Sequence, residues 1–292
     1  MNKEWGGIYP ALLTPFDKDN KINVKALNDL IDLNLKKGVK GFYVTGSTGE
    51  SFLLSTEERK QVMKIVKDRV GNKCKLIAQI GCIATHHAIE LAKYAEEIGY
   101  DAISSVAPFY YKFSFKEIKK YYFDIVDSVN LPMIIYNIPA FSGVTLSVDN
   151  LKEFLDDDRF IGVKHTSNDF FALERFKNAY PNKVFFNGYD EMFLSGLAMG
   201  ADGAIGSTFN FMAEKYIDIQ KYFEQGDIAS AQKIQKFVNK IIVDLIKVGV
   251  MAGEKEVLNQ MGIDFGDCRS PFSSLTEEQR KFVKDEIVAF LG

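Results

Sequence analysis

Lys164 has the clearest chemical potential of any residue in this sequence, because it lies inside an apolar segment, FIGVKHT. Burial disfavours the ammonium form, so such a segment normally excludes lysine. Side chains alternate along a strand, so Lys164 and Thr166 share one face and His165 points to the other. A buried amine at the mouth of a cavity is the nucleophile of Schiff-base chemistry on carbonyl compounds. The alternative is a structural lysine that extends to solvent or pairs with a carboxylate.

Tyr136 stands at the end of a second apolar run, in IIYNIPAFSG, just before a turn that contains proline and glycine. A phenol at this place can transfer protons if it lies within hydrogen-bond reach of the reacting atoms. The alternative for this tyrosine is packing in an apolar core. The sequence alone leaves both open.

A glycine-rich turn, VTGSTGES, surrounds Ser47 and Thr48. Glycines on both sides allow successive backbone N–H groups to form a small anion-binding nest, and the two hydroxyls add donors. The turn lacks the lysine and the length of a nucleotide-binding P-loop, so it fits one carboxylate better than a triphosphate. A plain tight turn is the alternative.

Polar side chains also follow two later apolar runs, in NGYDEMF and AIGSTFN. Asp190 and Glu191 come from the first, and Ser207 and Thr208 from the second. A metal site would need histidines or further carboxylates at suitable spacing, and the three histidines are expected elsewhere. We therefore expect no metal here and favour recognition of sugar hydroxyls, with capping of a helix N-terminus as the alternative.

Short apolar runs of strand character alternate with longer amphipathic runs along most of the chain. The short runs are bounded by glycine, proline or polar residues, which is typical of strands that are buried on both faces. Strands are expected at residues 8–13, 41–45, 76–80, 102–107, 133–137, 160–165, 184–187 and 203–206.

Helices are expected between these strands, and two of them carry clear end signals. One stops at Gly38, and another begins with Ser55 and Glu58 in capping-box spacing and ends at Gly71. Eight strands, each followed by a helix, are the count of a (β/α)₈ TIM barrel. An open doubly wound sheet is the alternative, but it would need a phosphate-type glycine turn after the first strand, where the sequence reads TPFDKDNK.

The barrel is expected to occupy residues 1–225, with the active site at the carboxyl ends of its strands. Residues 226–292 are expected to form a C-terminal helical appendage that packs on the barrel, so that the chain is a single structural unit. The residues singled out above would then meet at one end of the barrel. An amine, a phenol, an anion-binding turn and a hydroxyl-binding rim together favour an aldolase.

Composition excludes several other classes of protein. The chain has 292 residues, 47% hydrophobic and 26% charged, which is ordinary for a folded enzyme and not for a disordered chain. A net charge of -3 gives no basic footprint for nucleic acid. No apolar run reaches the length of a membrane span, and MNKEWGGIYP lacks the apolar stretch of a signal peptide. We expect a soluble cytoplasmic protein with reduced cysteines, without membrane or nucleic-acid partners.

Six motifs are similar, in order and spacing, to those of the dihydrodipicolinate synthase and N-acetylneuraminate lyase family, and most of all to its lyase branch. They are GSTGES, YYKFSF, YNIPAFSG, GVKHTSND, NGYDEMF and GADGAIGSTFN. The resemblance covers essentially the whole chain, including the C-terminal helices. It implies a homotetramer built from two tight dimers and an enzyme without a metal or organic cofactor, in which substrate forms a covalent imine with the protein.

The resemblance also implies roles for individual residues. Lys164 would form the Schiff base with pyruvate, and Tyr136 would transfer the proton. Ser47 and Thr48 would bind the pyruvyl carboxylate. Tyr110 would lie near a neighbouring subunit's site, linked to Tyr136 through a hydroxyl of the GSTGES turn. The positions that would hold the sugar-acid chain in the lyase branch are Thr166, Gly188, Asp190, Glu191 and Ser207.

One departure from the family pattern decides between its branches. Synthases usually carry an arginine in the turn after the strand-end tyrosine, to bind a second carboxylate, but here the turn is Ala140, Phe141 and Ser142. A partner with a carboxylate would stay unpaired, whereas a neutral N-acyl amino sugar would not. We therefore expect a class I aldolase that cleaves N-acetylneuraminate reversibly to pyruvate and N-acetylmannosamine.

Two other possibilities remain at this point. The first is another pyruvate-dependent aldolase, either a 2-keto-3-deoxy sugar acid aldolase or a dihydrodipicolinate synthase. The second, from a different class, is a non-catalytic sensor of sugar acids or pyruvate, which would bind its ligand without forming an imine.

Overall fold

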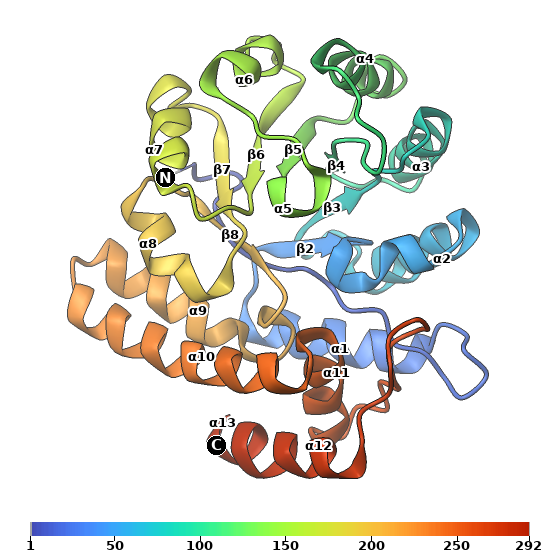
Figure 1. Cartoon of the computed structure of the whole chain (residues 1–292), viewed down its shortest axis with the longest axis vertical. Helices are drawn as coiled ribbons and strands as arrows, with labels where there is room; N and C mark the ends of the chain where they lie inside the picture. The colour runs from blue at the N-terminus through green and yellow to red at the C-terminus, as the bar shows by residue number, and fades with distance from the viewer. Residues whose placement is uncertain (1, 292) are drawn as a thin grey trace.

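A computed structural model describes residues 2–291 and shows eight parallel strands arranged as a barrel inside a ring of helices (Figure 1). The strands are β1 (Gly7–Pro10), β2 (Gly41–Val44), β3 (Lys75–Gln79), β4 (Ala102–Val106), β5 (Met133–Asn137), β6 (Phe160–His165), β7 (Val184–Asn187) and β8 (Gly203–Gly206). Their order in the sheet is β1-β8-β7-β6-β5-β4-β3-β2. The expected TIM barrel with a C-terminal helical extension is confirmed, and the doubly wound alternative is wrong.

The barrel closes between β1 and β2 through the segment after Pro10. The backbone N–H of Ala11 still donates to Gly206 of β8, but that of Leu12 donates to Tyr43 of β2. An isolated parallel bridge joins Ala11 to Tyr43. This change of partner explains why β1 is shorter than the strand expected at residues 8–13. The last four strands have the expected bounds.

Helices follow the strands, and two of them begin or end at the residues that the sequence predicted. The helices of the ring are α1 (Val24–Lys37), α2 (Thr56–Val70), α3 (Thr85–Glu97), α4 (Phe115–Val126), α6 (Val148–Leu155), α7 (Phe170–Ala179), α8 (Phe193–Ala198) and α9 (Phe209–Glu224). Gly38 ends α1 at a φ of 81°, the left-handed region that glycine enters without steric cost. Ser55 and Glu58 form the capping box of α2.

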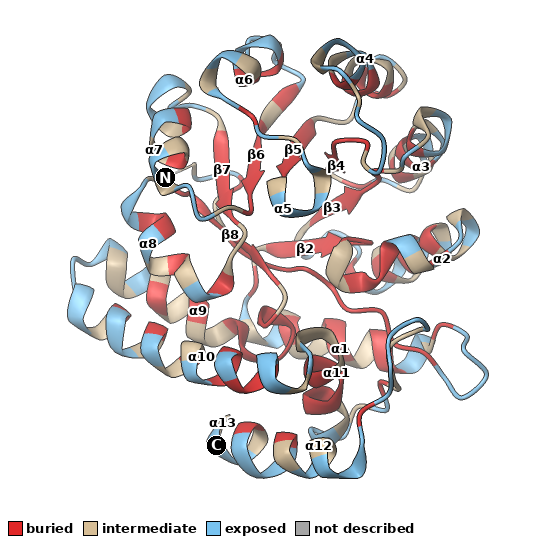
Figure 2. Cartoon of the chain, in the orientation of Figure 1, coloured by how far each residue is buried: buried red, intermediate tan, exposed pale blue. Residues whose placement is uncertain are grey.

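Two apolar layers hold the barrel together. The outer layer lies between the strands and the ring of helices, and the inner layer fills the barrel with side chains such as Tyr9, Ile134 and Phe186. In Figure 2 the strands are almost entirely buried, whereas most helices are buried only along the stripe that faces them. Strands that are buried on both faces read as short continuous apolar runs, which is why the sequence located them well.

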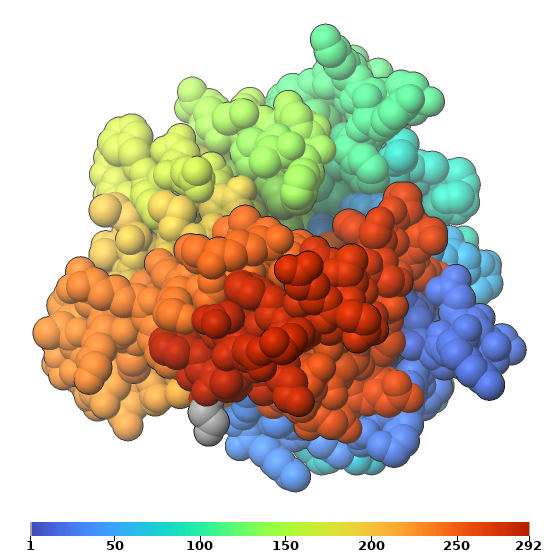
Figure 3. Space-filling view, turned by 60° about the horizontal axis from the view of Figure 1, so that its bottom comes forward, coloured from blue at the N-terminus to red at the C-terminus, as the bar shows by residue number. Residues whose placement is uncertain are grey.

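The C-terminal segment continues as α10 (Ile228–Val248), α11 (Val250–Gln260), α12 (Glu277–Phe282), the π-helical turn η4 (Val283–Val288) and α13 (Ala289–Leu291). The space-filling view shows this segment, orange to red, lying directly against the rest of the molecule (Figure 3). Gln235 of α10 accepts a hydrogen bond from the N–H of Leu194 and donates one to the carbonyl of Asp190. The division of the chain at residue 225 remains a prediction.

No helix within residues 2–291 is both long and apolar enough to span a membrane.

A buried ion pair joins α11 to the glycine-rich turn. Lys255 Nζ lies 2.5 Å from Glu50 Oε1, with side chains that are 1% and 0% exposed. It is an ion contact and not an aligned hydrogen bond, because Oε1 has no hydrogen-bond partner. The other oxygen, Oε2, accepts a hydrogen bond from the N–H of Arg269 at 2.8 Å. Glu50 thus ties the turn that holds Ser47 to the C-terminal segment.

Lys255→Met is expected to lower the free energy of unfolding by about 3–5 kcal/mol, since it leaves the Glu50 carboxylate buried without its cation. Chemical denaturation followed by circular dichroism measures this change. Lys240→Met is the control, because Lys240 pairs with Asp244 while its side chain is 47% exposed, and it is expected to cost less than about 1 kcal/mol. Equal effects of the two substitutions would contradict the role given to the buried pair.

Candidate active site

A cavity of about 380 Å³ opens at the carboxyl ends of the strands. It brings together residues from β5, β6 and β8, from the loop after β7 and from the turn after β2, as expected for an active site in this fold. The predicted site residues that line it are Ser47, Thr48, Tyr136, Lys164, Thr166, Gly188, Asp190, Glu191 and Ser207. Within residues 2–291, no group of three or more His, Cys, Asp or Glu side chains is placed to hold a metal ion.

Lys164 lies inside the barrel, between two aromatic rings. Its Cα pairs with that of Tyr136 on β5 and that of Phe186 on β7, and both neighbours belong to the inner layer. Its Nζ lies 4.1 Å from the ring centroid of Tyr136 and 4.5 Å from that of Tyr43. The side chain is 5% exposed, so the amine stands in a largely desolvated place at the cavity.

His165 lies on the opposite face of β6, toward the helix layer. Its Nδ1 is 3.0 Å from Asn137 Nδ2, and its Nε2 is 3.1 Å from the carbonyl of Asp169. Its ring packs at 5.6 Å against Phe176 of α7. Burial lowers the pKa of His165, so the neutral ring is favoured. Because side chains alternate along β6, the Lys164 amine faces the cavity and the His165 imidazole packs in the helix layer.

Tyr136 packs edge-on against Tyr43, with ring centroids 6.0 Å apart. The hydroxyl of Tyr43 lies 3.0 Å from that of Ser104, and burial raises the pKa of Tyr43 well above its usual value. Tyr43 is thus a neutral ring, held by its hydroxyl, that packs against both Tyr136 and the Lys164 amine. No pattern in the sequence distinguishes Tyr43, because a tyrosine within an apolar strand is typical of a core residue.

Ser47 and Thr48 lie on the short helix η1 (Ser47–Gly49) and are half-buried. The N–H of Gly49 donates to Gly46 and that of Glu50 to Ser47, so both close the turn. A side chain at Gly49 would place its Cβ 2.8 Å from the carbonyl of Leu12, which only glycine avoids. The turn therefore presents Ser47 and Thr48 to the cavity.

Thr166 and Gly188 form one closely packed corner of the cavity. Thr166 Oγ1 is buried and has no hydrogen-bond partner within the described chain. A Cβ at position 188 would come within 1.8 Å of this oxygen, so a side chain there would push Thr166 away. The corner supplies a hydroxyl whose partner must come from a ligand or from water.

Asp190 opens the short helix η3 (Asp190–Met192) and is 7% exposed. Its Oδ2 accepts hydrogen bonds from the N–H and the hydroxyl of Thr208, at 2.8 and 2.7 Å. Burial raises the pKa of Asp190 to about 6, although the Thr208 bonds oppose this. Asp190 therefore holds the first residues of α9 as well as lining the cavity, whereas Glu191 is exposed at the rim.

The raised pKa of Asp190 predicts a pH effect on stability. The folded state keeps the proton up to about pH 6, and the unfolded state loses it near pH 4. Stability from this group is therefore lost as pH rises from 4 to 6, by at most about 3 kcal/mol. Asp190→Asn is expected to remove this part of the decline in denaturation curves measured between pH 4 and 6. Asp158→Asn, an exposed control, is expected to leave it unchanged, and equal curves for wild type and Asp190→Asn would contradict the assignment.

The structure adds a wall to the cavity that sequence reasoning did not anticipate. Apolar side chains of α10 and α11 line it, namely Ile242, Ile246, Val250 and Met251.

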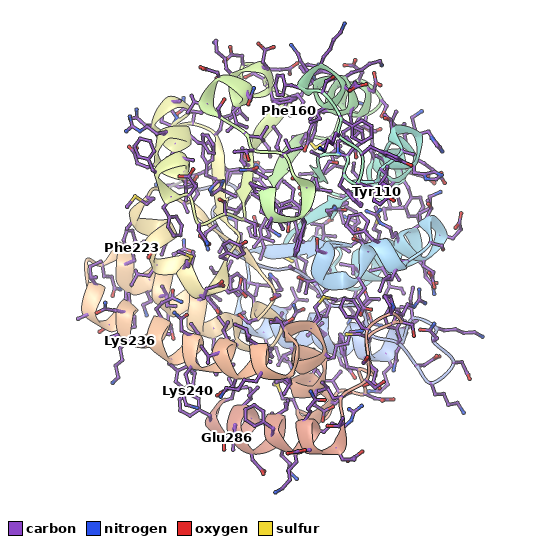
Figure 4. All side chains as sticks on the ribbon, viewed as in Figure 1. Tyr110, Phe160, Phe223, Lys236, Lys240 and Glu286 are labelled. Carbon is purple, nitrogen blue, oxygen red and sulfur yellow. The ribbon has the colours of Figure 1, made fainter. Side chains whose placement is uncertain are left out.

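Tyr110, by contrast, does not line the cavity of its own chain. It lies in the loop between β4 and α4, 84% exposed and with a φ of 76° (Figure 4). Its role at a neighbouring subunit's site remains a prediction.

Comparison with known proteins agrees with this geometry. The N-acetylneuraminate lyase of Clostridium perfringens (strain SM101 / Type A) is 45% identical over 280 residues, which cover 96% of this chain and 97% of that protein. The crystal structure of N-acetylneuraminate lyase from Fusobacterium nucleatum matches with a TM-score of 0.95 and 42% identity, covering 99% of this chain and 100% of that one. CdNal from Clostridium difficile, in complex with mannosamine, matches with a TM-score of 0.96 and 43% identity, covering 98% and 99%. The profile of the Dihydrodipicolinate synthetase family matches residues 4–290, and the chain belongs to that family.

Proposed function

We propose that this protein is an N-acetylneuraminate lyase, a class I aldolase that cleaves N-acetylneuraminate reversibly to pyruvate and N-acetylmannosamine. The observation that carries the proposal is the placement of the Lys164 amine beside the Tyr136 ring in a cavity at the carboxyl ends of the strands. The names of its full-length relatives support the choice of substrate.

The reaction begins when Lys164 attacks the keto carbon C2 of the open-chain sugar acid, and water leaves as the imine forms. The protonated imine accepts the electron pair of the C3–C4 bond as that bond breaks, which gives an enamine and the free aldehyde. Tyr136 takes the proton from the C4 hydroxyl during this step while its phenol gives up its own proton, which ends on C3 of the enamine. Protonation of the enamine and hydrolysis of the imine then release pyruvate and restore the amine.

Ser47 and Thr48 bind the carboxylate of the substrate in this mechanism. They approach the cavity from the turn after β2, while Lys164 approaches from β6. Two anchors on opposite sides of the pyruvyl group fix its rotation, so that the breaking bond is aligned with the imine π system. The chemistry requires no metal ion or organic cofactor, because the imine is the electron sink.

The other half of the cavity favours a neutral partner. Lys164 is the one cation among the described residues that line it. The turn after β5, α5 (Pro139–Ser142), carries Phe141, 76% exposed, where a synthase would need a cation. A second carboxylate in the substrate would be desolvated without a partner, which disfavours the synthase reaction.

We propose also that the protein works in the cytoplasm as a homotetramer, on the strength of the family resemblance.

Release of pyruvate from N-acetylneuraminate by the purified protein tests the proposal directly. Formation of pyruvate together with N-acetylmannosamine supports the lyase. Cleavage of a 2-keto-3-deoxy sugar acid in its place would identify another aldolase of the family. Ligand binding without turnover, and without an imine that borohydride can trap, would identify a sensor.

A further inference from the structure

Glu254 is a fully buried carboxyl group on α11 that has no ion pair within the described chain. The two other buried glutamates nearby each have a cation, because Glu50 pairs with Lys255 and Glu256 with Arg280. The Oε1 of Glu254 accepts a hydrogen bond of 2.6 Å from the hydroxyl of Ser207. Its Oε2 is buried without any hydrogen-bond partner. Ser207, at the end of β8, lines the cavity.

The surroundings of Glu254 favour its neutral form. Burial raises the pKa of Glu254 to about 8, and the nearby Asp190 carboxyl acts in the same direction, while the Ser207 bond opposes them. Tyr216 and Cys268 also interact with it electrostatically, and neither is a cation. With its proton on Oε2, neutral Glu254 still offers Oε1 as the acceptor for the Ser207 hydroxyl, and it does not act as a charge that attracts the substrate.

We propose that Glu254 is a positioning residue for substrate recognition: by accepting a hydrogen bond from the Ser207 hydroxyl, it leaves the Ser207 oxygen as a hydrogen-bond acceptor toward the cavity. A hydroxyl has one proton and two lone pairs, so a serine that donates to the protein can only accept from a ligand. The substrate group at this place must then be a donor, such as a sugar hydroxyl or an amide N–H. This inference rests on the proposed function and specifies how its sugar chain is chosen.

Neighbouring groups extend the same preference. Asp190 and Glu191 also line this cavity, and Lys164 is the one cation among the described residues that line it. A substrate chain rich in donors satisfies these acceptors, whereas a phosphate or carboxylate would be repelled by the two carboxyl groups. This part of the cavity thus favours neutral polyhydroxylated aldehydes and rejects anionic ones.

The fold does not require Glu254 for stability. A buried carboxyl oxygen without a partner costs free energy, and an apolar side chain of similar size would remove that cost. Glu254→Leu is therefore expected to fold with a melting temperature no lower than that of the wild type. Its defect should appear in substrate binding.

The test uses the full-length enzyme in the direction of condensation, with pyruvate and N-acetylmannosamine varied separately. Glu254→Leu is expected to raise the KM for the sugar about tenfold, the loss of one hydrogen bond, and to leave the KM for pyruvate within twofold. Glu254→Gln keeps a carbonyl acceptor and is expected to restore the sugar KM. Glu256→Gln, on the same helix but outside the cavity, is the matched control and is expected to leave both KM values unchanged.

A double-mutant cycle separates positioning from a general structural role. If Glu254 acts through Ser207, the variant with both Ser207→Ala and Glu254→Leu has the same sugar KM as Ser207→Ala alone. Equal changes in both KM values, additive effects in the cycle, or no rescue by glutamine would overturn the inference. If N-acetylmannosamine does not react but another neutral polyhydroxylated aldehyde condenses with pyruvate, the proposed function fails and the same variants test Glu254 on that aldehyde. Condensation of the wild type with anionic aldehydes only would overturn both.

Discussion

Lys164→Ala is expected to abolish turnover of N-acetylneuraminate, with a fall in kcat of at least about 10⁴-fold, because it removes the nucleophile on which the covalent route depends. Ser47, Thr48 and Asp190 still line the cavity in this variant, so binding of the sugar acid is expected to persist. The substitution removes an amine that is 5% exposed, which relieves a desolvation cost and leaves the fold intact.

Three measurements separate loss of chemistry from loss of structure. Circular dichroism and the melting temperature report the fold, and a pyruvate-release assay reports turnover. Borohydride reduction in the presence of pyruvate, followed by mass spectrometry, reports the imine. Wild type is expected to gain the mass of reduced pyruvate on Lys164, and Lys164→Ala is expected to gain none. Lys116→Ala, at an exposed position on α4, is the control and is expected to behave as wild type.

Retained turnover in Lys164→Ala would remove the Schiff-base mechanism altogether. Trapping of pyruvate on a different lysine would move the nucleophile while keeping the class of reaction. The geometry argues against this second outcome, since Lys164 is the one lysine among the described residues that line the cavity.

The fold could be predicted well from the sequence for a physical reason. Each strand is buried on both faces, so it reads as a short apolar run between glycines and polar residues. The helix ends were equally clear where a capping side chain or a left-handed glycine was required, as at Ser55 and Gly38. The exception was the end of β1, where the chain changes its pairing partner from β8 to β2 after Pro10. A change of partner leaves no mark in the apolar pattern.

The candidate site was predictable to the extent that it follows the ends of strands. Lys164 and Tyr136 could be expected at one end of the barrel because each lies near the carboxyl end of its strand, and the sheet pairs their Cα atoms. The contribution of Glu254 could not be expected, since its contact with Ser207 joins residues 47 positions apart through the packing of α11. Within its own helix Glu254 looks like one more charged residue beside Lys255.

Asp190 illustrates the same limit from another side. The sequence left open whether it binds hydroxyls or caps a helix, and the two alternatives are not exclusive in the structure. Its carboxylate accepts two hydrogen bonds from Thr208 at the start of α9 while it lines the cavity. Substitutions at Asp190 will therefore change stability and activity together, whereas those at Glu254 should separate the two.

Tyr136→Phe is expected to lower kcat by about 10²- to 10⁴-fold, the usual contribution of a positioned proton-transfer group. The phenylalanine ring keeps the edge contact with Tyr43 and the position over the Lys164 amine, so packing and nucleophile are preserved. Formation of the pyruvate imine is therefore expected to survive, as measured by borohydride trapping. The KM for N-acetylneuraminate should change much less than kcat, because the missing hydroxyl acts on the breaking bond and not on binding.

Tyr9→Phe provides the matched control for this substitution. Tyr9 also belongs to the inner layer of the barrel, but its hydroxyl donates to the carbonyl of Trp5, away from the cavity. It is expected to cost stability, through one lost hydrogen bond, and to leave kcat unchanged. A kcat near that of the wild type in Tyr136→Phe would assign the proton transfer to another group. A loss of imine trapping would instead show that the phenol acts before the carbon–carbon bond breaks, during attack by Lys164. These outcomes therefore show at which step of the reaction the Tyr136 hydroxyl acts.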